Sequence, residues 1–186
     1  NMRVLEFQFG RLVFSSKSLK MEPSLPDKVP ARAQYFHFEE GIGFVGTGFF
    51  DFKALKKDLE KKKFVWLHLS GSVSDDFLKH LAEFADFSDE QVKMLKFPHE
   101  RSVFEEYSNG LFWSMQRPYV TENIEAIENV NFFLIDRVLI SRQFSQDAAF
   151  NLVSHRLMSK GPQLTEFSVD KLAGYLIDDV LQSYVG

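Results

Sequence analysis

The stretch FVWLHL, residues 64–69, decides the fold that the sequence predicts. Its side chains alternate between two sides, so that Phe64, Trp66 and His68 share one side and aliphatic residues share the other. Both sides are mostly apolar, which is typical of a strand covered on both faces. We therefore expect a central strand in a sheet that has helices on either side.

Helical patterns surround this strand. Residues 51–62 place apolar side chains on one face and lysines on the other. Ser74 and Ser88 are each followed by acidic residues, which is the pattern of a capped helix start. Ser88 and Gln91 also have the spacing of a capping box. The helix that begins at Ser88 is predicted to end at Phe97, because the next residue is a proline.

Period-two patterns predict strands on both sides of these helices. Before residue 51 they lie at Leu5–Phe9, Arg11–Phe14, Tyr35–Phe38 and Phe44–Phe50, with a long loop over Ser15–Arg32. After residue 100 they lie at Val103–Glu106, Gly110–Gln116, Asn131–Ile135 and Arg137–Arg142. The segment Glu122–Asn129 is predicted to be a polar excursion between strands. The sum is an α/β fold in which a mixed β-sheet is sandwiched between helical layers (α/β/α).

Two helices are predicted at the C-terminal end. The first is capped by Ser145, has an apolar face that includes Leu152 and Leu157, and ends at Gly161-Pro162. The second begins at Ser168, and its apolar face is still running when the sequence ends at Gly186. We therefore expect residues 1–162 to form the α/β domain and residues 163–186 to begin a longer helical region.

Composition excludes several classes of protein. The 186 residues carry a formal charge of −4 and a pI near 5.8, which argues against a nucleic-acid partner. There are no cysteines, so disulfides and thiolate zinc sites are excluded. No apolar run approaches the roughly 18 residues that a membrane span needs. Asn1 precedes Met2, so we expect the natural chain to start at Met2, and no signal-peptide pattern follows.

Motifs for nucleotide or nucleophile chemistry are weak. Gly41, Gly43 and Gly46 have the spacing of a dinucleotide fingerprint, but charged residues follow where a phosphate-binding helix would begin. We expect these glycines to permit bends between strands, and Lys61-Lys62-Lys63 to be the solvated end of a helix. Ser70-Gly71-Ser72 lacks the glycine spacing of a nucleophile elbow.

Metal-ligand patterns are also weak. The histidines have none of the paired spacings of a zinc site; they are His37, His68, His80, His99 and His155. We expect His68 to be a hydrogen-bonded core residue and His155 to favour a helix C-terminus. Acidic pairs that would suit a loosely held Mg²⁺ recur at Glu39-Glu40, Asp75-Asp76, Glu105-Glu106 and Asp178-Asp179. Surface and helix-dipole roles explain these pairs better, and a histidine site assembled from distant segments stays an alternative.

The stretch from Lys96 to Pro118 leaves three alternatives open. It brings His99, Glu100 and Arg101 close to Glu105 and to an apolar strand. His99 with Glu100 or Glu105 would suit acid–base catalysis in a soluble enzyme. The same residues would suit a metal site, or a scaffold in a domain that serves only oligomerisation or ligand binding.

The order of these parts resembles the cytoplasmic domain of the CorA family of divalent-cation transporters. The resemblance rests on a capped helix, His99-Glu100-Arg101, the Asn109-Gly110 turn and an apolar strand, and it extends from Phe64 to Tyr184. Two further segments carry it, Trp66-Leu67-His68-Leu69 and Leu176-Ile177-Asp178. The Trp66 strand and Gly161-Pro162 are similar to the ZntB branch of the family.

The resemblance implies a regulatory domain rather than an enzyme. In the family the last helix continues into a stalk and two membrane helices, and five copies assemble at the cytoplasmic face of the inner membrane. No cofactor is expected, and divalent cations such as Mg²⁺ or Zn²⁺ are expected to bind weakly, between protomers. The family's Gly-Met-Asn pore signature would lie beyond Gly186. Lys93 and Met94 stand where magnesium transporters place a gating carboxylate, which favours ZntB-like transport and leaves Arg101 and Glu105 as scaffold residues.

Overall fold

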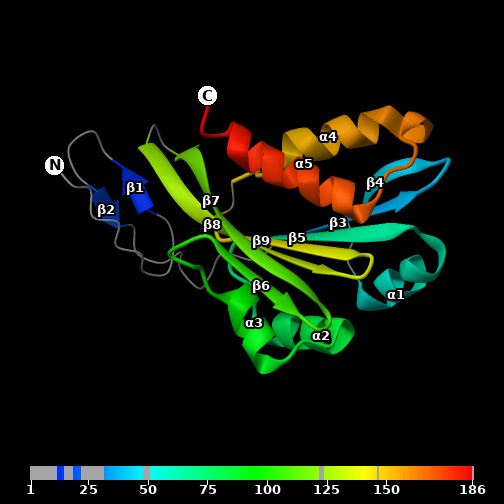
Figure 1. Ribbon diagram of the computed structural model, residues 1–186, viewed down its shortest axis with the longest axis horizontal. Helices are drawn as coiled ribbons and strands as arrows, with labels where there is room; N and C mark the ends of the chain where they lie inside the picture. Colours follow the sequence, from blue (N-terminus) through cyan, green and yellow to red (C-terminus); the bar gives the residue numbers. More distant parts are fainter. Residues whose placement is uncertain are drawn as a thin grey trace.

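The computed structural model describes residues 12–14, 19–21, 32–47, 51–121, 124–145 and 147–185 (Figure 1). The predicted strand Leu5–Phe9 and most of the predicted loop Ser15–Arg32 lie outside these residues. The described strands are β1 (Leu12–Phe14), β2 (Leu19–Met21), β3 (Arg32–Glu39), β4 (Gly43–Thr47), β5 (Phe64–Ser70), β6 (Val103–Tyr107), β7 (Gly110–Thr121), β8 (Ile124–Ile135) and β9 (Val138–Gln143). The described helices are α1 (Phe52–Lys61), α2 (Asp75–Ala85), α3 (Asp89–Lys96), α4 (Asn151–Lys160) and α5 (Val169–Gln182), with a 3₁₀ turn η1 at Gly161–Gln163.

The described strands form one mixed sheet of nine strands. Strands β5 and β9 are parallel, and every other neighbouring pair is antiparallel. Strand β8 organises one half of the sheet, because it pairs with β7 along one edge and with both β9 and β1 along the other. Strand β5 organises the other half, between β9 and β3.

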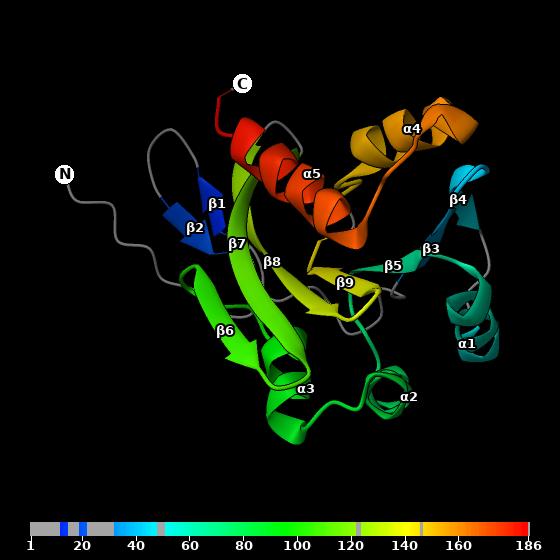
Figure 2. The same cartoon turned by 45° about the vertical axis from the view of Figure 1, so that its right-hand side comes forward.

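The sheet lies between two helical layers, which confirms the predicted α/β/α fold. Helices α4 and α5 cover one face, and α1, α2 and α3 cover the other (Figure 1 and Figure 2). All seven residues of β5 are buried, as the apolar pattern of residues 64–69 predicts. A strand of this kind cannot face water on either side, so both layers are required.

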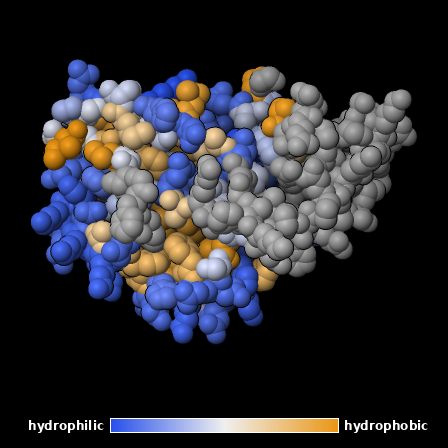
Figure 3. All heavy atoms as spheres, turned by 180° about the vertical axis from the view of Figure 1, so that it is seen from behind, coloured by the Kyte–Doolittle hydropathy of each residue, from blue (hydrophilic) through white to orange (hydrophobic). Residues whose placement is uncertain are grey.

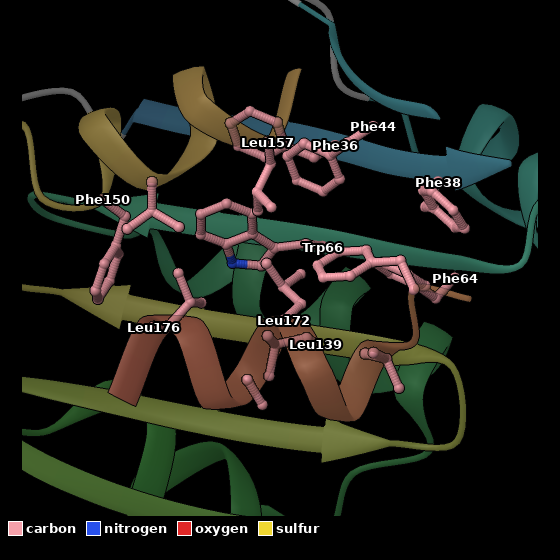
Figure 4. Close-up of a cluster of buried hydrophobic side chains, with 14 of the residues drawn as sticks. Phe36, Phe38, Phe44, Phe64, Trp66, Leu139, Phe150, Leu157, Leu172 and Leu176 are labelled. Carbon is pink, nitrogen blue, oxygen red and sulfur yellow. The ribbon is translucent and has the colours of Figure 1, made fainter. Parts of the chain in front are cut away.

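Aromatic side chains fill the core beneath α4 and α5 (Figure 4). Trp66 on β5 stacks on Phe36 of β3 with ring centroids 4.6 Å apart, and Phe36 stacks on Phe44 of β4. Leu172 and Leu176 of α5 are fully buried in the same cluster. The many phenylalanines of the sequence therefore serve packing, since Phe supplies apolar area without a polar group to satisfy.

The predicted helix starts are correct for α1, α2, α3 and α5. Asp51, Ser74, Ser88 and Ser168 each accept a hydrogen bond from a first-turn amide. The capping box is complete, because the Gln91 side chain also accepts from the Ser88 amide at 3.0 Å. Helix α3 ends at Lys96 with Phe97 as its C-cap, as the following proline predicts.

Strand β8 corrects the prediction of a polar excursion at Glu122–Asn129. The strand begins at Ile124, and the polar residues Glu128 and Asn129 inside it are fully buried. Strand β7 also extends beyond the predicted end at Gln116 and includes Pro118. Pro118 lies opposite Ile127 of β8 and beyond Ser114, where the described pairing of β6 with β7 ends, so β7 has a described partner on one side only, as at a sheet edge where proline is tolerated.

Helix α4 does not begin at Ser145, contrary to the prediction. Its first residue is Asn151, and Phe150 occupies the N-cap position without a side-chain hydrogen bond. Leu152, predicted for the apolar face, is 60% exposed. Ser145 instead lies before the helix and donates its amide N–H to Glu128.

Helix α5 packs its apolar face on the sheet of this domain. Val169, Leu172, Leu176 and Val180 are buried there, whereas Leu181 is 54% exposed. A domain boundary after residue 162 and a longer helix beyond Gly186 stay predictions. No helix in the described part of the chain is both long enough and apolar enough to span a bilayer.

On the side opposite the view of Figure 1, the described residues at the end that carries α1 are mostly hydrophilic, with smaller hydrophobic patches among them (Figure 3). Lys61 and Lys63 at the end of α1 are exposed, as predicted, whereas Lys62 is largely covered. Lys62 binds Glu39 at 2.5 Å and is 19% exposed, and Lys63 binds Glu40 at 3.3 Å. The Glu39-Glu40 pair therefore joins β3 to the end of α1, which gives these two acidic residues a structural role.

Gly43 and Gly174 provide a matched test of this packing. A Cβ on Gly43 would lie 2.4 Å from the carbonyl oxygen of Gly161, and its φ of +111° disfavours side chains. We expect Gly43→Ala to lower the free energy of unfolding by about 2–4 kcal/mol. Gly174 lies in α5 with open space around it, so Gly174→Ala should raise the same quantity by about 0.5–1 kcal/mol. Urea denaturation of both variants checks this, and equal effects would contradict the close contact.

Candidate functional site

The stretch with His99, Glu100 and Arg101 forms a strap across one face of the sheet. This strap, residues 97–102, connects α3 to β6 and has no regular secondary structure. Its backbone groups are bound by four polar side chains of β7 and β8, which we call the strap ladder: Ser114, Gln116, Asn129 and Asn131. These side chains lie on the face that α1, α2 and α3 cover.

Asn131 holds the end of α3. Its Nδ2 group lies within 3.2 Å of the carbonyl oxygens of Met94 and Leu95, and 2.9 Å from that of Phe97. The last carbonyls of a helix have no partner within the helix, and here those of Met94, Leu95 and the C-cap Phe97 converge on this one side-chain amide. One buried amide therefore satisfies the C-terminus of α3.

The other ladder residues hold the strap itself. Asn129 accepts a hydrogen bond from the His99 amide at 3.0 Å, and Gln116 donates to the His99 carbonyl oxygen at 2.8 Å. Ser114 donates to the Arg101 carbonyl oxygen and accepts from the Val103 amide, both at 3.1 Å. An irregular segment over a buried sheet requires such partners, because its backbone groups do not form the regular hydrogen bonds of a helix or a sheet.

The predicted catalytic residues do not converge. One ring nitrogen of His99, Nε2, lies 2.9 Å from the Met94 carbonyl oxygen, and the ring lies 5.3 Å from that of Phe112. No hydrogen bond within the described structure joins this ring to Glu100 or Glu105. The scaffold interpretation therefore holds for His99 and for the backbone of the strap. It was wrong for the side chains of Arg101 and Glu105, which are exposed and make no contact that fixes the junction.

The other candidate ligands are dispersed as well. Among the described residues, no group of three or more His, Asp and Glu side chains is placed to hold a metal ion. His80 and His155 are exposed, whereas His68 is fully buried. Asp75 pairs with Lys96 at 2.6 Å, in the first turn of α2 where a carboxylate is favoured. The glycines at 41 and 43 form the turn between β3 and β4, as predicted, and no helix begins there.

A second polar network crosses the opposite face, beneath α4 and α5. Trp66 donates its indole N–H to the Ser141 hydroxyl at 2.8 Å, and that hydroxyl lies 2.6 Å from Nδ1 of His68. Nε2 of His68 lies 2.7 Å from Oε1 of Gln143. The predicted role of His68 as a hydrogen-bonded core residue is confirmed.

Gln143, the last residue in this series of hydrogen bonds, determines which group donates and which accepts in each bond. The Nε2 group of Gln143 donates to the carbonyl oxygens of Ser145 and Asp147, so its Oε1 atom must accept. His68 therefore carries its proton on Nε2 and accepts from Ser141 through Nδ1. Burial lowers the pKa of His68 to about 4, with the Gln143 bond opposing and Arg117 and Arg142 adding to the effect. The imidazole is neutral at physiological pH.

Charged residues form the outer half of the same network. Arg117 on β7 lies 2.9 Å from both Glu128 and Asp147, and Glu128 accepts the Ser145 amide at 2.9 Å. Glu128 is fully buried, and burial raises its pKa while Ser145 and Arg117 oppose that rise. The pairing of β9 with β8 ends at Gln143. The Glu128 carboxylate binds the amide of Ser145, two residues beyond that end.

Arg142 is a second buried cation near the same strand end. It donates to the carbonyl oxygens of Gly71 and Gln143, and its guanidinium lies 4.2 Å from the centre of the Phe144 ring. Burial lowers the pKa of Arg142 to about 10, with Glu128 opposing, so the side chain stays charged at neutral pH. Carbonyl dipoles and an aromatic face take the place of a carboxylate here.

Sequence reasoning missed both networks, although a signal was present. Glu128, Asn129 and Asn131 are polar residues next to Val130 and Phe132 in a strand whose other residues, apart from Glu125, are apolar. Polar residues at positions that face both layers predict specific hydrogen-bond partners, because an unpaired buried polar group is destabilising. The partners lie in α3, the strap and the lead-in to α4, and the sequence does not identify them.

The arrangement has counterparts among known proteins. The model of the family described as CorA-like Mg²⁺ transporter protein matches residues 61–184, about two thirds of the chain. No curated protein sequence matches significantly. The matched family is one of transporters and not of enzymes.

Solved structures share the fold. The complete CorA magnesium transporter of Methanocaldococcus jannaschii is 14% identical with a TM-score of 0.64, over 84% of this chain and 46% of that one. The soluble domain of the same CorA is 13% identical with a TM-score of 0.62, over 81% and 57%. The ZntB cytoplasmic domain of Vibrio parahaemolyticus RIMD 2210633 is 15% identical with a TM-score of 0.59, over 79% and 56%. The chain thus spans about half the length of each of these relatives.

Asn131→Ala tests the strap ladder. We expect the free energy of unfolding to fall by about 2–3 kcal/mol, because the last carbonyls of α3 lose their buried donor. Asn151→Ala, at an exposed position in α4, is the matched control and should change it by less than about 0.5 kcal/mol. Urea denaturation measures both, and a small loss in Asn131→Ala would mean that water replaces the amide.

His68 gives a pH-dependent prediction. Its pKa is lower in the folded state than the usual 6.5, so its contribution to stability is complete above pH 6.5 and is lost as pH falls toward 4. A shift of this size corresponds to about 3 kcal/mol. The pH dependence of unfolding in this window should be weaker in His68→Gln. Nitrogen-15 NMR should find the Nε2–H form at pH 6, and a protonated ring at that pH would contradict the assignment.

Proposed function

The chain belongs to the CorA-like Mg²⁺ transporter family, and from this premise we propose that it is the cytoplasmic regulatory domain of a membrane transporter for divalent metal cations. The observation that carries the proposal is the family match from the end of α1 to the end of α5. The shared fold supports it, because the relatives include a soluble domain of CorA and a cytoplasmic domain of ZntB. The polar strap ladder supports it further, since it gives the His99 stretch a structural role.

The intact protein is proposed to be a homo-oligomer, a pentamer by resemblance, at the cytoplasmic face of the inner membrane. Membrane-spanning segments would follow this domain in the chain, since the match covers 46% of a complete CorA transporter. The domain would act by changing shape or contacts when the cation concentration changes. Its two buried networks would keep the sheet rigid, so that a change at one helix is transmitted to its neighbours.

The cation is proposed to follow the ZntB pattern. Lys93 and Met94 lie in the last turn of α3, and the Met94 carbonyl oxygen is bound by Asn131 and lies next to His99. This position therefore supports a helix end and does not present a carboxylate to a cation. Zn²⁺ or a similar ion is favoured over a magnesium-sensing site at this place.

Transport by the intact protein tests the proposal. The full-length protein, reconstituted in lipid vesicles that contain a fluorescent indicator, should carry Zn²⁺ or Mg²⁺ across the bilayer. Vesicles without protein are the control. A gene that encodes no pair of apolar segments of about twenty residues after this domain would defeat the proposal, as would an intact protein that moves neither ion.

Cation binding to the domain is proposed to be weak and to occur between protomers, because the described residues lack a single-chain ligand cluster. Titration calorimetry of the isolated domain with Zn²⁺ and Mg²⁺ should show no tight one-to-one complex. Tight binding of one ion per monomer would contradict this placement.

A further inference from the structure

Helix α4 begins differently from the other helices of the domain. Helices α1, α2, α3 and α5 each start with a side chain that accepts a first-turn amide, as described above. Among the described helices, α4 alone lacks this cap, because Phe150 occupies the position. A helix without a cap has a weaker first turn.

Phe150 is also held in an unfavourable backbone conformation. Its φ of 65° and ψ of 3° lie in the left-handed region, which bulky residues rarely adopt. The ring compensates by burial, with its centroid 5.4 Å from that of His68 and 6.2 Å from that of Trp66. Strain of this kind persists only where the surroundings enforce it, and it often marks an element that moves.

Three strand residues enforce the docked start of α4. We call them the latch: Arg117 of β7, Glu128 of β8 and Gln143 of β9. Gln143 donates to the carbonyl oxygens of Ser145 and Asp147, Arg117 pairs with the Asp147 carboxylate, and Glu128 accepts the Ser145 amide. Each latch residue therefore has at least one bond to Ser145 or Asp147, which precede α4.

The remaining contacts of α4 are mainly with β4, at the edge of the sheet, and with α5. Val153 and Leu157 of α4 are buried, and so are Ala149 and Phe150 just before it, so this segment buries four apolar residues where α5 buries five. At its far end Gly161 has a φ of 51°, and its carbonyl group packs closely on Gly43 of β4. A left-handed residue thus lies at each end of α4, and Figure 2 shows the helix over β4 at the outer side of the layer.

From these observations we infer that α4, with residues 147–150, is a flap that opens separately from the rest of the domain and is held closed by the latch. Opening relieves the strain at Phe150 and removes Leu157 from the core that it shares with Leu172 and Leu176 of α5. The flap is therefore coupled to α5 through common packing. That this coupling serves regulation of the intact protein rests on the function proposed above.

Hydrogen exchange measured by mass spectrometry tests the flap in the isolated domain. Amides of residues 151–160 should exchange at least tenfold faster than those of β5 and β9, because they open without global unfolding. Asp147→Asn removes the ion pair with Arg117 and should accelerate exchange in α4 roughly fivefold. Asp136→Asn is the matched control, since Asp136 is an exposed carboxylate in the β8–β9 turn and should leave α4 unchanged.

Two outcomes would overturn the flap. In the first, α4 exchanges only at the rate of β5 and β9 in the unmodified domain. In the second, Asp147→Asn accelerates exchange equally in all strands, which would mean that the latch supports global stability only.

Transport measurements separate the regulatory step from the flap. In the intact protein, Asp147→Asn should shift the cation concentration that gives half-maximal flux, and Asp136→Asn should not. Unchanged flux in Asp147→Asn would overturn the regulatory coupling and leave the exchange result standing. Absence of any flux in the unmodified protein would overturn the proposed function, and again the exchange result would stand.

Discussion

Burial of β5 on both faces is the constraint on which the structure depends. Because neither face of this strand tolerates water, the domain needs a helical layer on each side, and polar groups that lie between the layers must find partners inside. The strap ladder supplies partners for the strap and the end of α3 on one face, and the network from Trp66 to Arg117 supplies partners on the other. The two polar networks are thus consequences of the same architecture that the apolar pattern of residues 64–69 requires.

Local signals in the sequence predicted the elements whose physics is local. The caps at Ser74 and Ser88, the helix start at Ser168, the end of α3 before a proline and the alternating strand at β5 need only neighbouring residues, and each is confirmed. The predictions for strand β8 and for the start of α4 were wrong for a common reason. By its local sequence, Glu128 resembles a loop residue and Ser145 resembles a helix cap. In the structure the two are hydrogen-bonded to each other across 17 positions of sequence, which local patterns do not indicate.

The candidate site shows the same division between local and distant information. Sequence located the strap correctly and left its role open between chemistry and scaffold. What decided the role were Asn129 and Asn131, whose partners lie about 30 or more positions earlier in the chain. The exposed charges of the strap resemble catalytic groups in sequence, whereas the buried side-chain amides of Asn129 and Asn131 beneath them bind the strap and the end of α3.

The asymmetry between the two helical layers indicates where the domain is able to change. On one face the strap is bound at both its amides and its carbonyls, and α3 ends on a buried donor, so movement there would leave several backbone groups unpaired. On the other face α4 starts from a strained residue and depends on bonds made by the residues before it. Opening α4 would expose Ala149, Phe150, Val153 and Leu157, and release of the unfavourable backbone conformation of Phe150 would offset part of that lost burial. A rigid face beside a yielding one allows a small change at α4 to reach α5 without disturbing the sheet.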